Sequence, residues 1–443
     1  MKLQRADGTA ARRAALQVLG DIRNGRQFDA ALDRAVKQLG GDDRRLAHEL
    51  AAGILRRQSR LDSLLAPLVP RGWKKVAPGL KDVLRLGAYQ LTALDRVPAH
   101  AAVSTSVTLA RETSGSKASG FVNAVLRKLA AAEPSLFDEP AEGAGTSPRD
   151  PASLAAAHSH PEWLVRRWVE RFGYHEASAL LTWNNRKPVL VLQPARAPAT
   201  VLMRRWRQAG ITVHRAPFGA GLVTDRSRPD ELPGFVEGHF LVQDPAQALV
   251  AWYADIPHGE ILVDLCAAPG GKTVSIGRCI RGVVAADIHR TRTARLAENL
   301  RRAGSGRERA VVADGRIPPF RDVGALLLDA PCLGTGTFAR HPDARWRVTT
   351  EALASLADLQ RALLDAAGAT VRRGGLLVYS TCSLEPEENE LQVEAFLKRH
   401  REFRREPPDA FPDALLSARG DLTVLPQRHG MDGAFAARLR RKK

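Results

Sequence analysis

The sequence lacks any long apolar run and contains very little cysteine. None of its apolar stretches approaches the roughly 20 residues that a helix needs to cross a bilayer. The first residues, Met1-Lys2-Leu3-Gln4-Arg5, lack the apolar core of a signal peptide. The four cysteines all lie in the C-terminal half, at spacings that suit neither a disulfide framework nor a zinc site. We therefore expect a cytoplasmic protein that binds no membrane and no metal ion.

Positive charge, in contrast, is abundant. The chain has 66 Lys and Arg against 48 Asp and Glu, a net charge of +18, which favours a polyanionic partner. Residues 1–130 hold 23 of the basic and 11 of the acidic residues, so +12 of this charge lies there. A solvated helical surface has the same composition, so charge alone does not decide. Together with the chemistry of the C-terminal region described below, it predicts RNA docking.

Three regions precede the C-terminal domain, and the length of the chain allows several separate cores. Residues 1–135 are expected to be all-helical, because apolar residues such as Leu80, Leu84 and Leu91 recur on one helical face. Residues 136–160, rich in Ala, Pro, Glu, Gly and Ser, are expected to be a linker. Residues 161–245 are expected to form a small α+β domain. Its predicted elements are a helix at 162–172, an extended run at 188–193 and a helix at 199–209.

Residues 246–443 alternate short apolar strands with amphipathic helices, which predicts a Rossmann-like α/β domain with helices on both faces of a parallel sheet. The predicted strands are 261–265, 282–286, 310–313, 325–328 and 376–380. The predicted helices are 272–280, 291–303, 351–369 and 386–400. Two last strands, 422–425 and 433–439, have no predicted helix between them and are expected to form an antiparallel hairpin at one sheet edge.

A tight loop of small residues follows the first of these strands: Cys266-Ala267-Ala268-Pro269-Gly270-Gly271-Lys272. Ligands of such sheets bind at the carboxyl ends of the strands, where small residues let them approach the backbone. A phosphate-binding P-loop would need glycine at position 266, and the Gly-x-Gly-x-x-Gly dinucleotide pattern is absent. The loop therefore points to a ligand without a phosphate-binding motif.

Acidic residues end the next three strands, namely Asp287, Asp314 and Asp329. Asp287 is placed to accept hydrogen bonds from ribose hydroxyls, and Asp314 from an adenine amino group. One such aspartate is more often a helix cap. Three at successive strand ends favour an adenosyl cofactor, and without phosphate-binding machinery we expect S-adenosylmethionine.

Two cysteines lie in polar loops at the same edge: Cys332, which ends Asp329-Ala330-Pro331-Cys332, and Cys382, in Ser380-Thr381-Cys382-Ser383. An isolated cysteine is usually a small buried hydrophobe. A thiolate, however, is the group that activates cytosine, because its addition to carbon 6 makes carbon 5 enamine-like. Asp329 is placed to bind the N3/N4 edge of a base that has left its stack. The residues alone neither rank the two cysteines nor identify what stabilises the thiolate.

These motifs resemble the bacterial 16S ribosomal RNA cytosine-5 methyltransferases of the Sun/Fmu type (RsmB-like). The resemblance includes Asp264–Lys272, both cysteine motifs and Pro386-Glu387-Glu388-Asn389. Residues 84–91 and 121–127 are similar to the RNA-binding antitermination factor NusB. The resemblance implies a NusB-like helical domain joined to a class I methyltransferase domain.

The resemblance also implies roles for single residues. Cys266–Lys272, Asp287, Asp314 and Asp329 would bind S-adenosylmethionine, Cys382 would be the nucleophile, and Cys332 would assist product release. The implied reaction is methylation of carbon 5 of a specific cytosine in 16S ribosomal RNA, of the cytosine-967 type. The expected substrate is naked RNA or an early assembly intermediate, and the expected state of the protein is a monomer.

Two other functions stay open at this point. One is a non-catalytic RNA-binding or antitermination factor with a degenerate methyltransferase domain, against which the intact loop and cysteine motifs argue. The other is DNA cytosine methylation, for which we identify no separate base-reading domain. Ser104-Thr105-Ser106 and Val191-Leu192-Gln193 depart from the family pattern, and both departures concern RNA docking.

Overall fold

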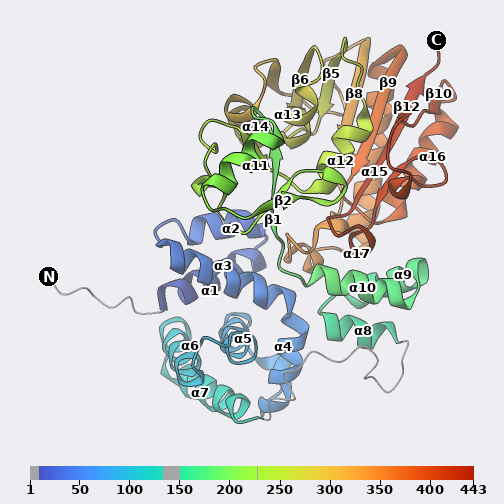
Figure 1. Cartoon of the computed structure of the whole chain (residues 1–443). Coiled ribbons are helices and arrows are strands. Elements are labelled where there is room, and N and C mark those ends of the chain that lie inside the picture. The colour runs from blue at the N-terminus through green and yellow to red at the C-terminus, as the bar shows by residue number, and fades with distance from the viewer. Residues whose placement is uncertain (1–8, 133–149, 227) are drawn as a thin grey trace. The chain divides into compact units, whose positions relative to one another are not determined.

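The computed structural model describes residues 9–132, 150–226 and 228–443. The chain divides into two compact units, Met1–Arg186 with Phe338–Arg347, and Lys187–Thr337 with Val348–Lys443. Helices alone form the regular structure of the first unit where it is described, whereas the second contains two sheets (Figure 1). Across the described residues, we find no helix with the length and apolar character needed to cross a membrane.

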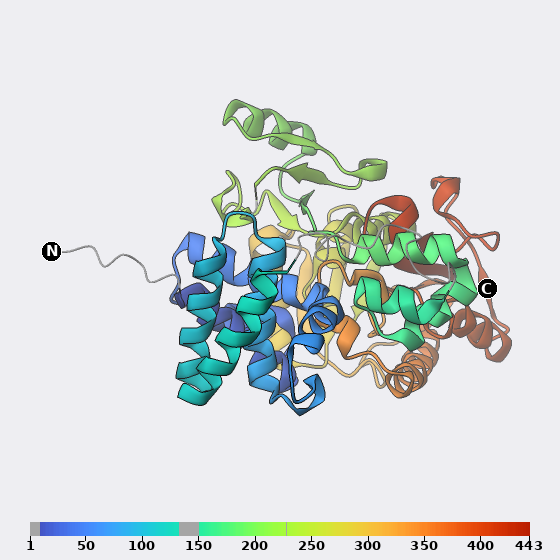
Figure 2. The same ribbon diagram turned by 90° about the horizontal axis from the view of Figure 1, so that it is seen from below.

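The all-helical N-terminal region predicted from the sequence is confirmed. Its α-helices are α1 (Thr9–Arg23), α2 (Phe28–Ala35), α3 (Gly41–Arg56), α4 (Gln58–Leu65), α5 (Pro78–Ala93), α6 (Ala99–Ser114) and α7 (Ser116–Ala130). Helices α6 and α7 lie side by side and are joined at Gly115, whose φ is +86° (Figure 2). On α5, a Cβ at Gly87 would lie 2.3 Å from Leu126, so this glycine lets α5 and α7 approach closely.

Three more helices belong to the same unit and pack on one another (Figure 2): α8 (Pro151–His158), α9 (Glu162–Phe172) and α10 (Tyr174–Asn184). Helix α9 was predicted. Of the expected linker, 136–149 lie outside the described residues, whereas 151–158 form α8. Asp150 caps this helix by accepting hydrogen bonds from the backbone N–H groups of Ala152 (3.1 Å) and Ser153 (2.9 Å). The linker-like composition thus hid a short capped helix.

The second unit opens with a small antiparallel sheet whose strand order is β2-β3-β1-β4. Its elements are β1 (Leu190–Pro194), α11 (Ala199–Gln208), β2 (Val213–Arg215), β3 (Leu222–Thr224) and β4 (Phe240–Val242). Trp206 of α11 packs edge-on against Phe240, with ring centroids 5.2 Å apart. The predicted run 188–193 and helix 199–209 correspond to β1 and α11. Strands β2 to β4 were not predicted, because three residues are too few to show an alternating pattern.

The large sheet has the order β10-β12-β9-β8-β5-β6-β7, with β11 paired to β12. Strands β5 to β9 are parallel, and β12 runs antiparallel to β9. The elements in chain order are α12 (Pro245–Ala254), β5 (Ile261–Leu265), α13 (Gly271–Gly277), β6 (Gly282–Asp287), α14 (Arg290–Ala303), β7 (Glu308–Val312), β8 (Val323–Asp329), α15 (Thr350–Thr370), β9 (Val371–Thr381), α16 (Glu390–Arg399), β10 (Phe403–Arg405), β11 (Leu422–Val424), α17 (Pro426–His429) and β12 (Ala434–Arg441).

Helices cover both faces of this sheet (Figure 1). Alternate residues of a strand point to opposite faces. Leu327 of β8 therefore packs with Leu296 of α14, whereas its neighbour Leu326 packs with Leu363 of α15 and Phe396 of α16. This arrangement confirms the predicted Rossmann-like domain and explains why its central strands β5, β6 and β8 are largely apolar.

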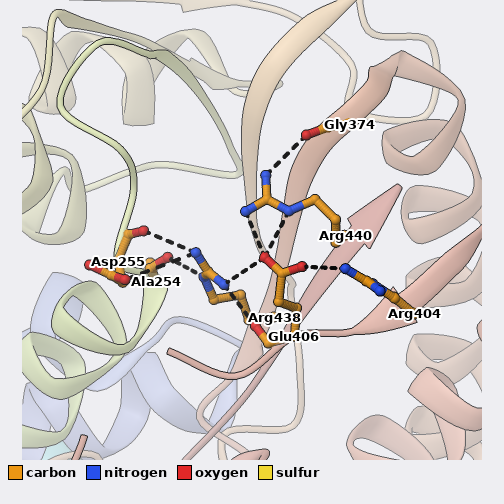
Figure 3. Close-up of polar contacts among 7 residues, drawn as sticks. All are labelled: Ala254, Asp255, Gly374, Arg404, Glu406, Arg438 and Arg440. Atoms are coloured by element: carbon orange, nitrogen blue, oxygen red, sulfur yellow. Dashed lines mark hydrogen bonds and ion pairs between the residues drawn. The ribbon is translucent and has the colours of Figure 1, made fainter. Parts of the chain in front are cut away.

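The antiparallel edge is more elaborate than the predicted hairpin. Strands β11 and β12 pair as expected, but α17 lies between them, and the unpredicted β10 also pairs with β12. Glu406, just after β10, accepts hydrogen bonds from Arg438 (3.3 Å) and Arg440 (2.8 Å) of β12 (Figure 3). Arg438 Nε also donates to Ala254 O (3.1 Å) at the end of α12. The Glu406 carboxylate therefore links β10 to β12, and Arg438 links this edge to α12.

Candidate active site

The small-residue loop leaves β5 through two unusual backbone conformations. Cys266 has a φ of +59° and Gly270 a φ of +102°. A Cβ at Gly270 would lie 2.6 Å from Leu296, and one at Gly271 would lie 2.7 Å from Gln243, so glycine permits close packing at both positions. Burial raises the pKa of the Cys266 thiol to about 12, so this cysteine stays protonated near neutral pH.

Lys272 connects the loop to the end of β8. Its Nζ lies 2.7 Å from Asp329 Oδ2 and also donates to Gln247. The other oxygen of Asp329 accepts a hydrogen bond from Ser380 Oγ at 2.9 Å. Two donors therefore orient this carboxylate at the carboxyl end of the sheet. Beneath it, the buried Asp264 accepts a hydrogen bond from Thr273.

A cavity of about 450 Å³ opens at the carboxyl ends of β5, β6, β8 and β9. It brings together six of the residues singled out in the sequence: Cys266, Asp287, Asp314, Asp329, Cys332 and Cys382. Ala268 also lines it. The remaining loop positions, Ala267 and Pro269 to Lys272, are not among the residues that line the cavity.

Asp287 and Asp314 differ in how many hydrogen bonds their carboxylate oxygens already accept. Asp287 accepts from His289 N (3.0 Å) at Oδ1, but its buried Oδ2 accepts no hydrogen bond from a described residue, although Arg292 lies 3.3 Å away. Asp314 accepts hydrogen bonds from Arg316, whose Nη2 lies 2.7 Å from Asp314 Oδ2. These hydrogen bonds lower the pKa of Asp314, so it is charged.

Cys332 and Cys382 lie side by side in the cavity lining, with their Sγ atoms in contact at 3.4 Å. They form no disulfide. The hydrogen bond with Cys382, together with burial, raises the pKa of Cys332 well above its ordinary value. Cys332 therefore stays protonated near neutral pH.

Hydrogen bonds fix the backbone around Cys382. Asn389 Nδ2 donates to Ser383 O (2.9 Å), while its Oδ1 accepts from Thr381 Oγ1 (2.5 Å). Gly336 N donates to Cys382 O (3.0 Å), and a Cβ at Gly336 would lie 2.8 Å from that same oxygen. Glycine is thus needed where the two cysteine loops meet.

A buried Glu and Gln hold the backbone around Cys332. Glu388 Oε1 accepts hydrogen bonds from Leu333 N and Gln360 Nε2, both at 2.9 Å. Gln360 Nε2 also donates to Pro331 O at 2.8 Å. Burial raises the pKa of Glu388 to about 7, despite the hydrogen bonds that it accepts. These hydrogen bonds therefore fix the backbone at Pro331 and Leu333, on either side of Cys332.

The sequence analysis identified neither Glu388 nor Gln360 as a residue that positions Cys332. Glu388 lies in the quoted Pro386–Asn389 motif, but its importance depends on a contact with residue 333. Gln360 lies within α15 and has no local signal. The predicted helix 386–400 is also corrected: Pro386–Glu388 form a single 3-10 turn, and α16 begins at Glu390.

Three family models match the chain. Residues 252–440 match the 16S rRNA methyltransferase RsmB/F family, 9–131 the NusB family, and 160–228 the ferredoxin-like domain of RsmF/B-like methyltransferases. The chain is 37% identical to a probable ribosomal RNA small subunit methyltransferase B of Synechocystis sp., over 98% of this chain and 99% of that protein. It is 34% identical to the Vibrio cholerae ribosomal RNA small subunit methyltransferase B, over 97% and 96%. The chain belongs to this family.

Solved structures share the fold. The crystal structure of PH0851 has a TM-score of 0.81 at 24% identity and covers 100% of both chains. NSun6 from Pyrococcus horikoshii, solved with SFG, has a TM-score of 0.57 at 22% identity and covers 64% of this chain and 98% of its own. Family membership confirms the expected class of enzyme, an S-adenosylmethionine-dependent methyltransferase of ribosomal RNA with a NusB-like domain.

Proposed function

We propose that this enzyme methylates carbon 5 of a cytosine in 16S ribosomal RNA, of the cytosine-967 type, through a covalent bond between Cys382 and the base. The observation that carries the proposal is the pair of thiols 3.4 Å apart in a cavity that also contains three strand-end aspartates. Methylation of a ring nitrogen or ribose oxygen needs no such pair, whereas methylation of carbon 5 needs a thiol to activate the ring.

The cofactor fits the loop side of the cavity. The unfilled Oδ2 of Asp287 suits a ribose hydroxyl, and Asp314 suits an adenine amino group. The segment Cys266–Lys272 would enclose the cofactor, and Asp329 would stand between it and the base. When bound, S-adenosylmethionine supplies the electrophilic methyl group.

Cys382 Sγ would form the bond to carbon 6, which turns carbon 5 into a nucleophile. After carbon 5 has gained the methyl group, it passes its proton to a base from solvent. The electron pair of that C–H bond then forms the double bond between carbons 5 and 6, the bond between carbon 6 and sulfur breaks, and Cys382 leaves as a thiolate. The S–H group of Cys332 is suited to stabilise that thiolate before attack and after release. This supports the roles of Cys382 as nucleophile and Cys332 as the residue that assists product release.

Asp329 would select the base. Held by Lys272 and Ser380, its carboxylate can accept a hydrogen bond from the cytosine amino group but repels the corresponding uracil oxygen. Because the base has to leave its stack, we propose naked RNA or an early assembly intermediate as the substrate. We also propose that the enzyme acts in the cytoplasm and as a monomer.

The test compares wild type, Cys382→Ala and Cys332→Ala on 16S ribosomal RNA. Wild type should produce 5-methylcytidine and form an adduct that resists denaturation on RNA containing 5-fluorocytosine. Cys382→Ala should do neither, and Cys332→Ala should accumulate the adduct on natural RNA. Turnover by Cys382→Ala but not by Cys332→Ala would reverse the two roles. Mapping the modified base in a strain without this protein tests the position.

A further inference from the structure

The loops that carry Cys332 and Cys382 are joined by hydrogen bonds that do not involve either thiol. Leu384 N donates to Thr335 Oγ1 at 2.8 Å, and the hydroxyl oxygens of Thr335 and Ser383 share a hydrogen bond at 3.2 Å. Thr335 and Ser383 are at most 1% exposed, so water does not compete for these contacts. The spacing between the two loops is therefore fixed independently of the contact between the sulfurs.

The turn that follows Cys332 passes close to the Cys382 thiol. Gly334 has a φ of +68°, and a Cβ at this position would lie 3.8 Å from Cys382 Sγ. Thr337 closes the turn, since its Oγ1 donates to Gly334 O at 2.8 Å. The turn thus keeps the two sulfurs at their contact distance of 3.4 Å. Both thiols are partly exposed in the lining of the cavity of about 450 Å³, which is large enough to admit a small oxidant.

Two thiols held in this way differ in reactivity from an isolated cysteine. The sulfurs of a disulfide lie about 2.05 Å apart, so an approach of about 1.4 Å, by rotation about the Cα–Cβ bonds, brings them from contact to bonding distance. A partner thiol held next to the reacting sulfur acts as if at high concentration. Cys266 lines the same cavity, but among the described residues its thiol makes no comparable contact with Cys332 or Cys382. The geometry therefore favours a bond between Cys332 and Cys382.

We propose that Cys332 and Cys382 form a site of reversible oxidation, at which hydrogen peroxide converts the two thiols into a disulfide. The Cys382 thiolate attacks one peroxide oxygen, the O–O bond breaks, and the hydroxide that leaves takes a proton from solvent and becomes water. The Cys332 sulfur then attacks the sulfenic sulfur of Cys382. The S–O bond breaks, and the hydroxyl group leaves with the Cys332 proton as a second water. Two electrons pass from the sulfurs to the peroxide.

The disulfide stops methyl transfer, because the sulfur of Cys382 can no longer form a bond to carbon 6. This consequence, and the choice of Cys382 as the thiol that reacts first, rest on the proposed function. The disulfide also protects Cys382 from further oxidation to the sulfinic acid, which thiols do not reduce. Disulfides in a reducing compartment are usually transient. Methylation of ribosomal RNA therefore pauses during exposure to peroxide and resumes once the disulfide is reduced.

The test treats the reduced, full-length protein with increasing amounts of hydrogen peroxide, alkylates the remaining thiols after denaturation and maps the cross-linked peptides by mass spectrometry. A peptide pair joined through Cys332 and Cys382 should accumulate, and methyl transfer should fall in proportion to the fraction of molecules that carry it. Dithiothreitol should restore both thiols and the activity. The proposal is overturned if peroxide oxidises the exposed Cys279 while both cavity thiols can still be alkylated, or if Cys266 pairs with either of them.

Two variants separate this pairing from general oxidation. Cys279→Ser removes an exposed cysteine that does not line the cavity and should form the disulfide, and lose and regain activity, as the wild type does. Cys332→Ser removes the second thiol, so Cys382 should be oxidised to a state that dithiothreitol does not reduce, as measured by its alkylation. Full recovery of Cys382 in Cys332→Ser would count against the proposal.

The peptide map of the wild type needs no variant, so it decides the proposal even if Cys332→Ser fails to fold. It also needs no turnover. A wild type that makes no 5-methylcytidine but forms the disulfide would refute the proposed function and support the oxidation site. Full cross-linking with undiminished methyl transfer would likewise support the site and refute the role of Cys382 as nucleophile.

Discussion

The two thiols of the candidate active site differ in their surroundings. Cys332 is hydrogen-bonded to Cys382, and its flanking backbone is held by Glu388 and Gln360. A raised pKa keeps Cys332 protonated, so its S–H group is able to donate to Cys382. In the proposed mechanism, the S–H group of Cys332 stabilises the Cys382 thiolate, a role that the sequence left unassigned, and the contact between the two thiols links motifs 50 residues apart.

Glu388 provides a test of how Cys332 is positioned. Glu388→Ala removes the acceptor for Leu333 N and Gln360 Nε2, and leaving such buried donors unpaired costs about 1 to 3 kcal/mol each. We expect methyl transfer in a single turnover to persist, while release of the product slows roughly tenfold, equivalent to about 1.4 kcal/mol in the barrier. The measurement is the lifetime of the RNA–protein adduct after rapid mixing.

The control for this prediction is Glu388→Gln, which keeps one acceptor oxygen but cannot ionise. It should restore much of the release rate and lose any step near pH 7 that the wild-type release profile shows, since the pKa of Glu388 is about 7. A Glu388→Ala enzyme that slows adduct formation and release equally would show that the residue only stabilises the fold.

The sequence identifies a candidate site residue when its neighbours in the chain already indicate its position in the fold. Asp287 and Asp329 were found because each ends an apolar strand, and strand ends of a parallel sheet share one edge. Gln360 was missed because a glutamine inside a long helix looks like any surface residue until β8 and β9 are in place. Similarly, the distance between the two cysteines follows from strand order, which no single motif contains.

At the level of elements, length decides what the sequence predicts. The predicted ends lie within a few residues of the observed ends for the longer strands β5, β6 and β8. Strand β9 was predicted as well, but it begins five residues earlier than expected, at Val371. Of the three-residue strands, β11 was predicted together with its partner β12, whereas β2, β3, β4 and β10 were not, since so short a segment lacks a period. Their positions come from pairing with longer neighbours.

The antiparallel edge should depend on Glu406. Its carboxylate is 30% exposed and compensates Arg438, which is 7% exposed, so Glu406→Gln should lower the free energy of unfolding by about 1 to 2 kcal/mol, less than for a fully buried pair. Arg404→Gln, which removes a partner that is 64% exposed, is the control and should cost under about 0.5 kcal/mol. Urea unfolding of both variants measures the difference.

The same cluster has a defined pH dependence. The hydrogen bond from Arg440 lowers the pKa of Glu406 below that of an unfolded carboxyl. Its stabilisation is therefore complete above the unfolded pKa and is lost as the pH falls through the lowered folded pKa. The gap between wild type and Glu406→Gln should accordingly close at acid pH; a gap that widens there would contradict the assignment.

At the level of the whole molecule, the path of the chain was the least predictable feature. Residues Phe338–Arg347, which follow the Cys332 loop within the methyltransferase sequence, belong to the same compact unit as the N-terminal helices. Nothing in the composition of residues 338–347 indicates that they belong to the first unit. Its most informative residue, Arg345, reads as a surface arginine until its acceptors from Ser159, Asn184 and Asn185 are known.

Arg345 should therefore be a stability determinant of the first unit. Arg345→Ala leaves three buried acceptors, the carbonyl oxygens of Ser159, Asn184 and Phe338, without this donor, and at about 1 to 3 kcal/mol for each unpaired group the loss should exceed about 3 kcal/mol. His341→Ala, at an exposed position of the same segment, is the matched control and should have little effect. Limited proteolysis should cut 1–186 sooner in Arg345→Ala, while S-adenosylmethionine binding, which depends on residues of the second unit, is retained. Equal proteolysis of the two variants would mean that the buried guanidinium contributes no net stability, as expected if relief of its repulsion with Arg56 offsets the lost hydrogen bonds.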